Sequence, residues 1–499
     1  MSDAIKKPLP SIWSSGGFWL CSTFLFLSVF AFHGKQVPFS NEFVYLLRLE
    51  PGFLPNDWTF SHAANEHWLF NTIFSIPTYF LPLTTVGWVG RIAVWCLCLA
   101  AVVKLGRKWE IPYWAIAISV TLWLASGQSP VAEEWIFGGF EAKAVSYVCL
   151  LFALDQFSER KIFVPSILLG LTFSFHPAVG LWAIPAVGLA LLIEKSDLRS
   201  LSKVVGIVFL FSLPGVLPLL SEQVGADASV LENWKFMVLT RLPWHLDPFQ
   251  FPRRGIALLS AMLVFCIVGL WNNKSYALRF LVRFQATLGV FFIFGIVLRY
   301  FEEYTLLRLM PMRLFPVFTP LLFLFSLFYL FPQLNSIKTK VAVSILAVLM
   351  IVVLDPHGMG YRLISETVES WTAKPDDLNK ALSWISENTP NNALVVGPPH
   401  SRELWFLSKR AQIVSYTYPR YDRMTEWRKR IGDLSGNAVF SDPDHAMGEL
   451  DTAFNDLSPN QIETIRQNYS ADYLVSRAVY PYHVIFETGT YKVYQLTPN

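Results

Sequence analysis

The sequence has 499 residues, of which 53% are hydrophobic and only 15% are charged, and its mean hydropathy is +0.40. A soluble domain normally carries about 25% charged residues, so the composition excludes a purely soluble protein and indicates a membrane protein. The net charge of +3 is small for this length and no basic tail is present, so no nucleic-acid partner is expected. All five cysteines lie in apolar stretches, where they predict neither a disulfide framework nor a metal site.

Apolar stretches long enough to cross about 30 Å of hydrocarbon recur up to residue 354. They predict a polytopic bundle of about eleven α-helices, near residues 15–33, 84–103, 111–127, 142–157, 162–176, 178–194, 204–220, 255–271, 284–300, 313–331 and 338–354. The first stretch lacks a convincing cleavage site and is interpreted as an uncleaved span. The stretch 67–83 contains Pro77 and Pro82 and is predicted to be an interfacial helix in the headgroup region.

With eleven spans, the short basic loops fall on one face of the membrane. They are Lys6/Lys7, Lys104/Arg107/Lys108, Arg160/Lys161, Lys195/Arg199/Lys203, Lys274/Arg279/Arg283 and Lys338/Lys340. The positive-inside rule makes that face cytoplasmic. The sequence therefore predicts a multi-pass protein of the inner (plasma) membrane whose polar loops and C-terminal region face outward.

A change in composition after Asp355-Pro356 predicts two domains, a membrane domain at 1–355 and an extracytoplasmic α/β domain at 356–499. Helices are expected at 375–387, 401–409, 422–434 and 458–469, and strands at 393–397, 412–416 and 472–476. The last segment, 484–496, is predicted to be a hairpin with Gly489 in the turn. The alternating order of strands and helices indicates a small, largely parallel sheet.

Ionisable side chains gather in four outer segments, and such groups at the rim of a membrane domain are costly unless they have a function. The candidates are Asp57 in the first loop, Glu133, Glu134, Glu141 and Lys143 in the second, Arg241, His245 and Asp247 in a third, and Arg308 and Arg313 before a late span. A carboxylate in such a segment can accept a proton from a hydroxyl group, and cationic side chains can stabilise a phosphate. Asp57 is suited to the first task, and the arginines and His245 to the second.

The order of several sequence strings along the chain carries a resemblance. PGFLPNDWTFS (51–61), EEWIFGGFEAKA (133–144), SFHPAVGLW (174–182), RLPWHLDPF (241–249), RLMPMRLF (308–315) and WISENTPNNALVVGPP (384–399) are similar to a largely uncharacterised branch of bacterial membrane proteins. Together with the acidic outer loops and the C-terminal outer domain, the chain resembles the GT-C superfamily of polyprenol-dependent membrane glycosyltransferases. The resemblance covers nearly the whole chain.

The resemblance implies transfer of a sugar from a lipid-linked phosphate donor, on the outer face, to a glycan, lipid or protein acceptor. It implies that Asp57 is the first-loop acid, a general base or a metal ligand, and that Glu133 or Glu134, rather than Glu141, is the second acid. A divalent cation, Mg²⁺ or Mn²⁺, is compatible with these carboxylates but is not diagnosed by them. The first loop has no paired acids and the C-terminal domain lacks a Trp-Trp-Asp-Tyr-Gly run, so transfer to asparagine sequons is not supported.

Structural interpretations stand beside these functional ones. Asp57 lies in a good turn sequence, Glu133 and Glu134 are placed to cap or solvate a helix end, and Glu141 could pair with Lys143. His176-Pro177 marks a helix break, and Arg313 is placed to anchor a helix end at the interface.

Two other classes of protein remain open. A transporter would carry charges deep in its spans and inverted repeats, neither of which is found here. A non-catalytic GT-C-like scaffold or assembly factor is the closer alternative. In an enzyme Asp57, His245 and Arg308 should converge on one outward cavity, whereas in a scaffold they should scatter into separate pairs.

Overall fold

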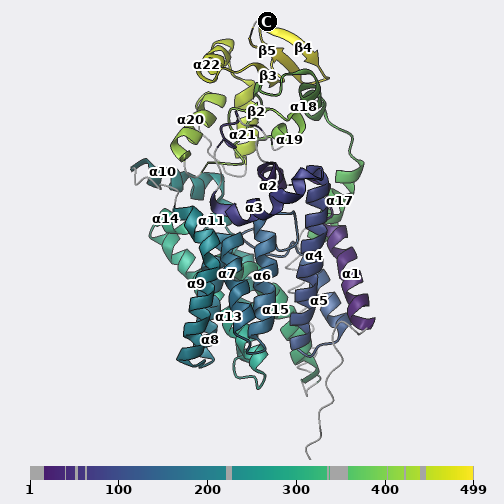
Figure 1. The fold of residues 1–499 in the computed structure, drawn as a ribbon, viewed down its shortest axis with the longest axis vertical. Coiled ribbons are helices and arrows are strands. Elements are labelled where there is room, and N and C mark those ends of the chain that lie inside the picture. The colour runs from purple at the N-terminus through teal and green to yellow at the C-terminus, as the bar shows by residue number, and fades with distance from the viewer. Residues whose placement is uncertain are drawn as a thin grey trace, which may run out of the picture.

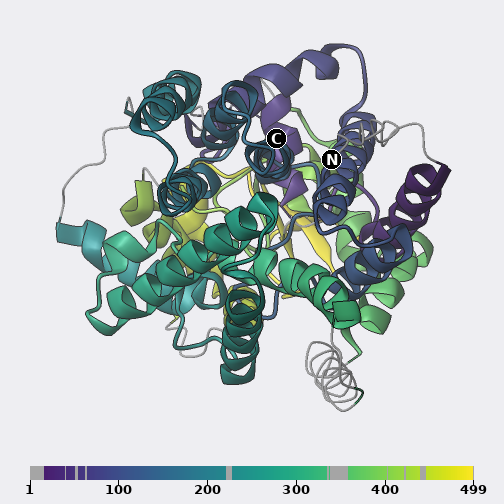
Figure 2. The same cartoon turned by 90° about the horizontal axis from the view of Figure 1, so that it is seen from below.

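The structure is a computed structural model that describes residues 16–39, 41–50, 54, 56–61, 65–220, 228–333, 337, 358–401, 403–420, 423–438 and 445–497. These residues form a long helical bundle with a small α/β domain at one end (Figure 1). Figure 2 views the molecule from below and shows the bundle helices, with the sheet of the α/β domain behind them.

The bundle confirms a helix at each predicted span that the structure describes. These helices are α1 (Gly16–His33), α4 (Leu83–Lys108), α5 (Tyr113–Ala125), α6 (Ala142–Phe157), α7 (Phe163–Phe175), α8 (Pro177–Ile193), α9 (Leu198–Leu220), α12 (Arg253–Leu270), α13 (Tyr276–Tyr300) and α15 (Leu314–Leu330). The predicted span 338–354 lies outside the described residues. Within the described part of the chain, six helices are long and apolar enough to cross a membrane by themselves, namely α1, α4, α9, α12, α13 and α15 with the turn that follows it.

The shorter helices α5, α6, α7 and α8 end early at the end of the bundle that carries the α/β domain. The loop 126–141 fills the space after α5, and His176-Pro177 breaks the chain between α7 and α8. Irregular backbone at membrane depth is tolerated where protein buries it. The end of the bundle that carries the α/β domain is therefore built from loops as well as helices, and this is where polar side chains enter its interior.

Short helices cover the same end of the bundle. They are α2 (Glu42–Leu49), η2 (Asn65–His67), α3 (Trp68–Ser75), η3 (Ile76–Tyr79), α10 (Ala228–Phe236), the π-helical turn η4 (Met237–Arg241), α11 (Pro243–Leu246) and α14 (Tyr304–Leu307); η5 (Phe331–Gln333) follows α15. Figure 1 shows α2 and α3 lying across the top of the bundle. The predicted interfacial segment 67–83 thus contains α3 and η3 and no helix crossing the bundle before α4 begins.

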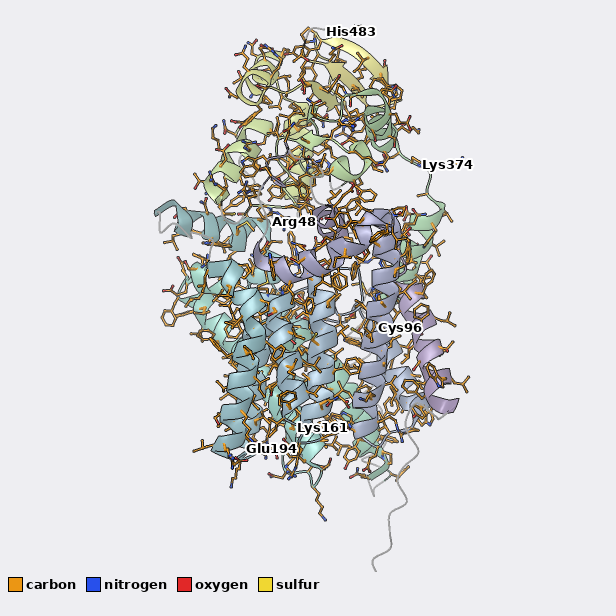
Figure 3. All side chains as sticks on the ribbon, in the orientation of Figure 1. Arg48, Cys96, Lys161, Glu194, Lys374 and His483 are labelled. Carbon is orange, nitrogen blue, oxygen red and sulfur yellow. The ribbon has the colours of Figure 1, made fainter. Side chains whose placement is uncertain are left out.

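The opposite end of the bundle carries the basic loops, as Lys161 and Glu194 show in Figure 3. Acidic partners hold these basic residues close to the helix ends: Lys104 lies 2.7 Å from Asp155, and Arg279 lies 3.0 Å from Glu194. Arg48, Lys374 and His483 lie toward the end that carries the α/β domain (Figure 3). Lys161 and, through its pair with Glu194, Arg279 therefore lie at the end of the bundle away from the α/β domain.

The C-terminal region begins, after the undescribed segment, with α17 (Met359–Thr372), a helix that the sequence did not predict and that packs on α1 and α5. The α/β domain follows with α18 (Asp377–Asn388), β1 (Leu394–Val396), α19 (Leu404–Ser408), β2 (Ala411–Gln412), α20 (Met424–Leu434), α21 (Ala446–Asn455), α22 (Pro459–Tyr469), β3 (Tyr473–Ser476), β4 (His483–Glu487) and β5 (Lys492–Gln495). Of these helices, α21 was not predicted.

The five strands form one mixed sheet in the order β2-β1-β3-β5-β4. Strands β1, β2 and β3 are parallel, whereas the terminal hairpin adds β5 and β4 antiparallel. The predicted largely parallel sheet is thus correct for three strands only, because a hairpin that closes the chain can pair only antiparallel. The predicted strand 412–416 is reduced to Ala411–Gln412, since the following residues turn away to meet the bundle.

A small apolar cluster joins the α/β domain to the bundle. Trp405 of α19 is fully buried against Val44 and Leu47 of α2, and Phe406 contacts Phe43 with ring centroids 5.8 Å apart. Helix α2, which lies between α1 and α4 in the chain, is therefore also the part of the membrane domain on which the C-terminal domain packs.

Candidate functional site

The loop between α5 and α6 folds into the outer end of the bundle and is held there by Gln128. Its side-chain oxygen accepts hydrogen bonds from the backbone N–H groups of Ile136 (2.8 Å) and Phe137 (2.9 Å), and its Nε2 donates to the Phe137 carbonyl (2.7 Å). Because one buried amide satisfies three loop groups, the loop is stable without regular structure. It brings Glu134, one acid of the pair predicted from the sequence, into the bundle.

The two acids of that pair point in opposite directions. Ala132 and Glu133 both adopt left-handed backbone conformations, with φ of 64° and 47°, which non-glycine residues adopt seldom. After this turn Glu133 is exposed, whereas Glu134 is buried with 1% of its surface accessible. Glu134 is therefore the acid that belongs to the interior site.

Glu134 is the centre of a buried cluster of charged and phenolic side chains. Its Oε2 accepts from Nε of Arg313 at 2.6 Å and its Oε1 from the hydroxyl of Tyr147 at 3.1 Å. Nζ of Lys143 lies 3.9 Å from Glu134 Oε1 and 4.0 Å from Glu141 Oε2. Arg313 precedes α15, and Glu141, Lys143 and Tyr147 come from the first turns of α6. The cluster thus joins α6, α15 and the loop.

Glu141 is the unsatisfied member of this cluster. It is 1% exposed, and its Oε1 has no hydrogen-bond partner among the described residues. A buried polar atom left without a partner costs about 1 to 3 kcal/mol, so such an atom requires an explanation. Burial raises the pKa of Glu141 to about 7, against an opposing effect of Lys143 and with a further increase from Glu42. Burial also acts to raise the pKa of Glu134, but Arg313 and Lys143 outweigh it and bring the pKa below its usual value.

A neutral aromatic and imidazole group lies beside the charged cluster. The hydroxyl of Tyr45 and Nε2 of His67 are 3.1 Å apart, and the rings of His67 and His176 lie 4.9 Å apart. Burial lowers the pKa of His67 to about 3 and that of His176 well below its usual value, and the nearby Arg313 adds to both shifts. Both imidazoles are therefore neutral at physiological pH. His176 also caps α8, accepting from the Val179 N–H at 3.4 Å, which confirms the predicted helix break.

Asp57 occupies a different site, at the contact with the α/β domain. It is fully buried, and its carboxylate accepts hydrogen bonds from Nε1 of Trp405 (2.6 Å) and from the backbone N–H groups of Gln412 (2.9 Å), Thr59 (2.8 Å) and Phe60 (3.1 Å). Burial raises the pKa of Asp57 to about 6, while the hydrogen bonds from Gln412 and Trp405 oppose the shift. The expected outward-facing loop carboxylate is thus a fully bonded one inside an interface.

Arg241, His245 and Asp247, the third group of residues predicted for the site, each make a separate contact. Nε of Arg241 donates to the Tyr416 carbonyl at 2.8 Å, which ties the bundle to the α/β domain. Asp247 pairs with Arg299 at 2.9 Å, and Nδ1 of His245 lies 2.5 Å from the carbonyl of Ala132, where burial lowers the imidazole pKa to about 4.

Arg308 lies apart from the cluster, partly exposed at the edge of the outer end. Its guanidinium stacks 4.9 Å from the ring of Trp234 in α10, and no ion pair is found for it among the described residues. Arg313, by contrast, already has Glu134 as its counter-ion. The two arginines that the sequence placed together therefore have different electrostatic environments.

Of the ten residues predicted for the site, the structure brings together Glu134, Glu141, Lys143 and Arg313. His245 lies close enough for Glu134 to raise its pKa against the larger effect of burial. Tyr147, Tyr45 and His67 were missed. Tyr147 was detectable in principle, because it lies four residues after Lys143 on the same face of α6. The side chains of Tyr45 and His67 reach the site through the fold of the first loop, which leaves no local sequence pattern.

A divalent cation does not fit this arrangement well. Among the residues that the structure describes, no group of three or more His, Cys, Asp or Glu side chains is placed to hold a metal ion. Glu134 faces Arg313, and Lys143 lies between Glu134 and Glu141, so both carboxylates already have cationic neighbours.

The bundle and the C-terminal α/β domain together have a fold similar to that of several solved structures. The chain is similar to the Archaeoglobus fulgidus oligosaccharyltransferase tethered to an acceptor peptide with an NVT sequon (TM-score 0.55, 12% identity, 94% of this chain and 69% of that one). It is equally similar to AglB of the same organism in complex with an inhibitory peptide and a dolichol-phosphate (TM-score 0.56, 12% identity, 94% and 70%). ArnT from Cupriavidus metallidurans bound to undecaprenyl phosphate also matches (TM-score 0.50, 12% identity, 97% and 98%).

These likenesses establish the fold. Residues 376–434, at the start of the α/β domain, match a family described as a domain of unknown function (DUF6798). No curated protein sequence matches the chain.

Proposed function

We propose that the chain is a GT-C-type glycosyltransferase that moves a sugar from a polyprenyl-phosphate-linked donor to an acceptor on the outer face of the membrane. The observation that carries the proposal is the buried cluster around Glu134 and Glu141 at the end of the bundle beneath the α/β domain. Its position, its two cations and its unsatisfied carboxylate are what such a transfer requires.

Glu141 is the proton acceptor in this proposal. Its free Oε1 accepts the proton of an acceptor hydroxyl as the acceptor oxygen forms the new bond to the anomeric carbon. The bond from that carbon to the donor phosphate oxygen breaks, and the phosphate leaves with the electron pair. A pKa near 7 suits this role, because such a group is partly ionised at working pH and still basic enough to take the proton. Glu134 acts as a positioning residue that orients Arg313 and Tyr147.

The donor phosphate is assigned chiefly to Arg308. Two of the structural relatives are bound to a dolichol-phosphate and to undecaprenyl phosphate, which supports a lipid-phosphate donor here. A guanidinium without a carboxylate partner binds a phosphate more readily than one that must first leave its counter-ion. Arg308 meets this condition, and Arg313 meets it only if the phosphate competes with Glu134.

The test is binding of undecaprenyl phosphate to the full-length protein in nanodiscs, measured by native mass spectrometry. Arg308→Gln should weaken binding by about 10- to 100-fold, as expected for the loss of one charge-assisted contact. Arg313→Gln should weaken it less once the lower stability of that variant is taken into account. Arg199→Gln, at the opposite end of the bundle, is the matched control. Equal binding by all four proteins would contradict the proposed donor site.

A non-catalytic scaffold is the second candidate, and one observation favours it. Asp57, His245 and Arg308 do not converge: Asp57 binds Trp405, His245 faces Ala132, and Arg308 stacks on Trp234. By the criterion set from the sequence, these three residues behave as in a scaffold. Loss of a glycan or glycolipid from cell extracts in a Glu141→Gln strain, with normal membrane abundance of the protein, would decide for the enzyme.

The orientation in the membrane is also a proposal. The α/β domain lies at the end of the bundle opposite the basic loops, which supports an extracytoplasmic C-terminal domain (Figure 3). A phosphatase fused after Asn499 should be active, whereas a fusion in the loop at Lys161 should be inactive. The reverse pattern would invert the topology and place the candidate site in the cytoplasm.

A further inference from the structure

The α/β domain contains an open cleft, separate from the cluster in the bundle, with a volume of about 820 Å³. It lies among the N-terminus of α18, the loop after β1, helix α21 and the turn between β4 and β5. Its lining residues are Asp376, Asp377, Leu378, Asn379, His400, Ser401, Glu403, Met447, Thr490 and Tyr491. A volume in this range accommodates a ligand of several rings.

The topology of the sheet independently favours a ligand site at this place. From β1 the chain moves to β2 on one side, and β3 later returns parallel to β1 on the other side. The carboxyl ends of β1 and β3 therefore flank a topological switch point, where open α/β sheets bind their ligands. The loop after β1 supplies His400, Ser401 and Glu403, and Tyr491 precedes Lys492, which pairs with the last residue of β3.

The cleft is rigid where it is most acidic. The carboxylate of Asp377 accepts from the backbone N–H of Thr490 at 3.0 Å and from Nζ of Lys380 at 3.0 Å, and Asp376 caps α18 through the N–H of Asn379 at 2.7 Å. Trp384 and Phe486 stack with ring centroids 4.9 Å apart between α18 and the hairpin. These contacts fix the wall formed by α18 and the hairpin before any ligand binds.

The described side chains that line the cleft are acidic or neutral. Three of its side chains are carboxylates, and none of the described residues that line it is Lys or Arg. Burial lowers the pKa of His400 despite the nearby Asp451, so the imidazole adds no positive charge at neutral pH, and its Nδ1 has no hydrogen-bond partner among the described residues. A phosphate, a nucleotide or a uronic acid would be repelled. A neutral or cationic ligand with many hydroxyl groups would be bound.

The remaining lining has the mixture that binds sugar rings. Tyr491 offers an aromatic surface, Leu378 and Met447 are apolar, and Ser401 and Asn379 supply a hydroxyl and an amide. Sugars present apolar C–H faces and hydroxyl edges, so aromatic surfaces and carboxylates complement them together.

We infer that this cleft binds an uncharged or amino-bearing oligosaccharide, the glycan acceptor or product of the membrane domain. That this oligosaccharide is the acceptor or product rests on the proposed function, whereas the binding of a sugar in the cleft does not depend on it. Helix α19 connects the cleft to the contact between the α/β domain and the bundle: Glu403 of the cleft precedes it, and its Trp405 donates to Asp57 of the membrane domain at 2.6 Å. A glycan held in the cleft is thus attached to the element that docks on the outer end of the bundle.

The experiment measures binding of a β-linked glucosamine tetramer and a glucose tetramer to the full-length protein in nanodiscs, by calorimetry and saturation-transfer NMR. A glucuronic acid tetramer and a tetralysine peptide serve as charge controls. We expect both neutral and amino tetramers to bind and the uronic tetramer not to bind. Tyr491→Ala should weaken binding at least about tenfold, whereas Tyr491→Phe, which keeps the ring, should stay within about threefold of wild type.

The acidic contribution has its own matched pair of variants. Glu403→Gln should lower affinity for the glucosamine tetramer about 3- to 10-fold more than for the glucose tetramer, since only the first carries ammonium groups. Glu387→Gln, an exposed acid outside the lining, should change neither. Binding of tetralysine without binding of either sugar would overturn the assignment, as would sugar binding that Tyr491→Ala leaves unchanged. Sugar binding by a protein that transfers no sugar would retain the cleft and refute only the proposed function.

Discussion

Two buried carboxylates at the outer end of the bundle, Asp57 and Glu141, differ in how completely their oxygens are satisfied. Asp57 accepts four hydrogen bonds, two of them from the α/β domain. Glu141 is equally buried, yet one of its oxygens has no partner among the described residues. Since both burials are costly, the protein compensates the first within its own structure and leaves the second uncompensated. A fully bonded acid stabilises the fold, whereas an incompletely bonded one is available to a substrate.

Replacing Glu141 by Gln gives the largest expected effect. Gln keeps the size of the side chain and removes its basicity, so turnover should fall by roughly 10²- to 10⁴-fold. Folding should be unaffected or slightly improved, because a buried carboxylate becomes neutral. Product is measured in membranes that contain equal amounts of protein, with the exposed neighbour Glu133→Gln as the matched control. Equal loss in both variants would show that the burial of Glu141 has no bearing on catalysis.

Arg313→Gln should act on stability before it acts on turnover. The substitution leaves Glu134 buried without its main counter-ion, which typically costs about 3 to 5 kcal/mol. The double variant Glu134→Gln/Arg313→Gln removes both charges and should recover much of the loss. Thermal unfolding of the purified proteins in one detergent measures both effects. A double variant as unstable as the single one would mean that Arg313 contributes by packing and not by charge.

Asp57→Asn tests the other half of the comparison. In Asp57, Oδ2 accepts from both Trp405 and Gln412, and Oδ1 accepts from both Thr59 and Phe60. The amide nitrogen of Asn would replace one of these oxygens and lose both of its hydrogen bonds, at about 1 to 3 kcal/mol each. The α/β domain should detach more often, which limited proteolysis in the exposed segment 373–376 would detect. Turnover should fall only as far as docking does. Loss of turnover with unchanged proteolysis would instead support the catalytic role predicted for Asp57 from the sequence.

The sequence predicted the bundle well because its signal is local. Runs of apolar residues specify a helix wherever it packs, so each predicted span within the described residues contains a helix. The environment of Asp57 could not be predicted, since its partners Trp405 and Gln412 lie about 350 residues away in the chain. Glu134 turns inward because Ala132 and Glu133 adopt left-handed backbone conformations. Without a glycine, the sequence does not predict such conformations. Strand β2 was shortened by contacts of the following residues with Arg241.

The pH dependence gives the smallest effect and the finest test of the comparison. Burial raises the pKa of Glu141 from its ordinary value of 4.5 to about 7. As a proton acceptor it must be ionised, so the rate should fall up to about tenfold for each pH unit below 7. The stability changes with pH in the opposite direction to the rate. Between pH 4.5 and about 7 the folded state retains this proton and the unfolded state does not. The contribution of Glu141 to the free energy of unfolding is therefore greatest below pH 4.5 and is lost as the pH rises through 7. Both effects are measured by profiles of kcat/KM and Tm against pH for wild type and Glu141→Gln. In Glu141→Gln, Tm should no longer change with pH between 4.5 and 7 through this group. The remaining rate of that variant should no longer fall below pH 7. A rate limb near pH 4.5 in the wild type would contradict the raised pKa of Glu141 and its role as the proton acceptor.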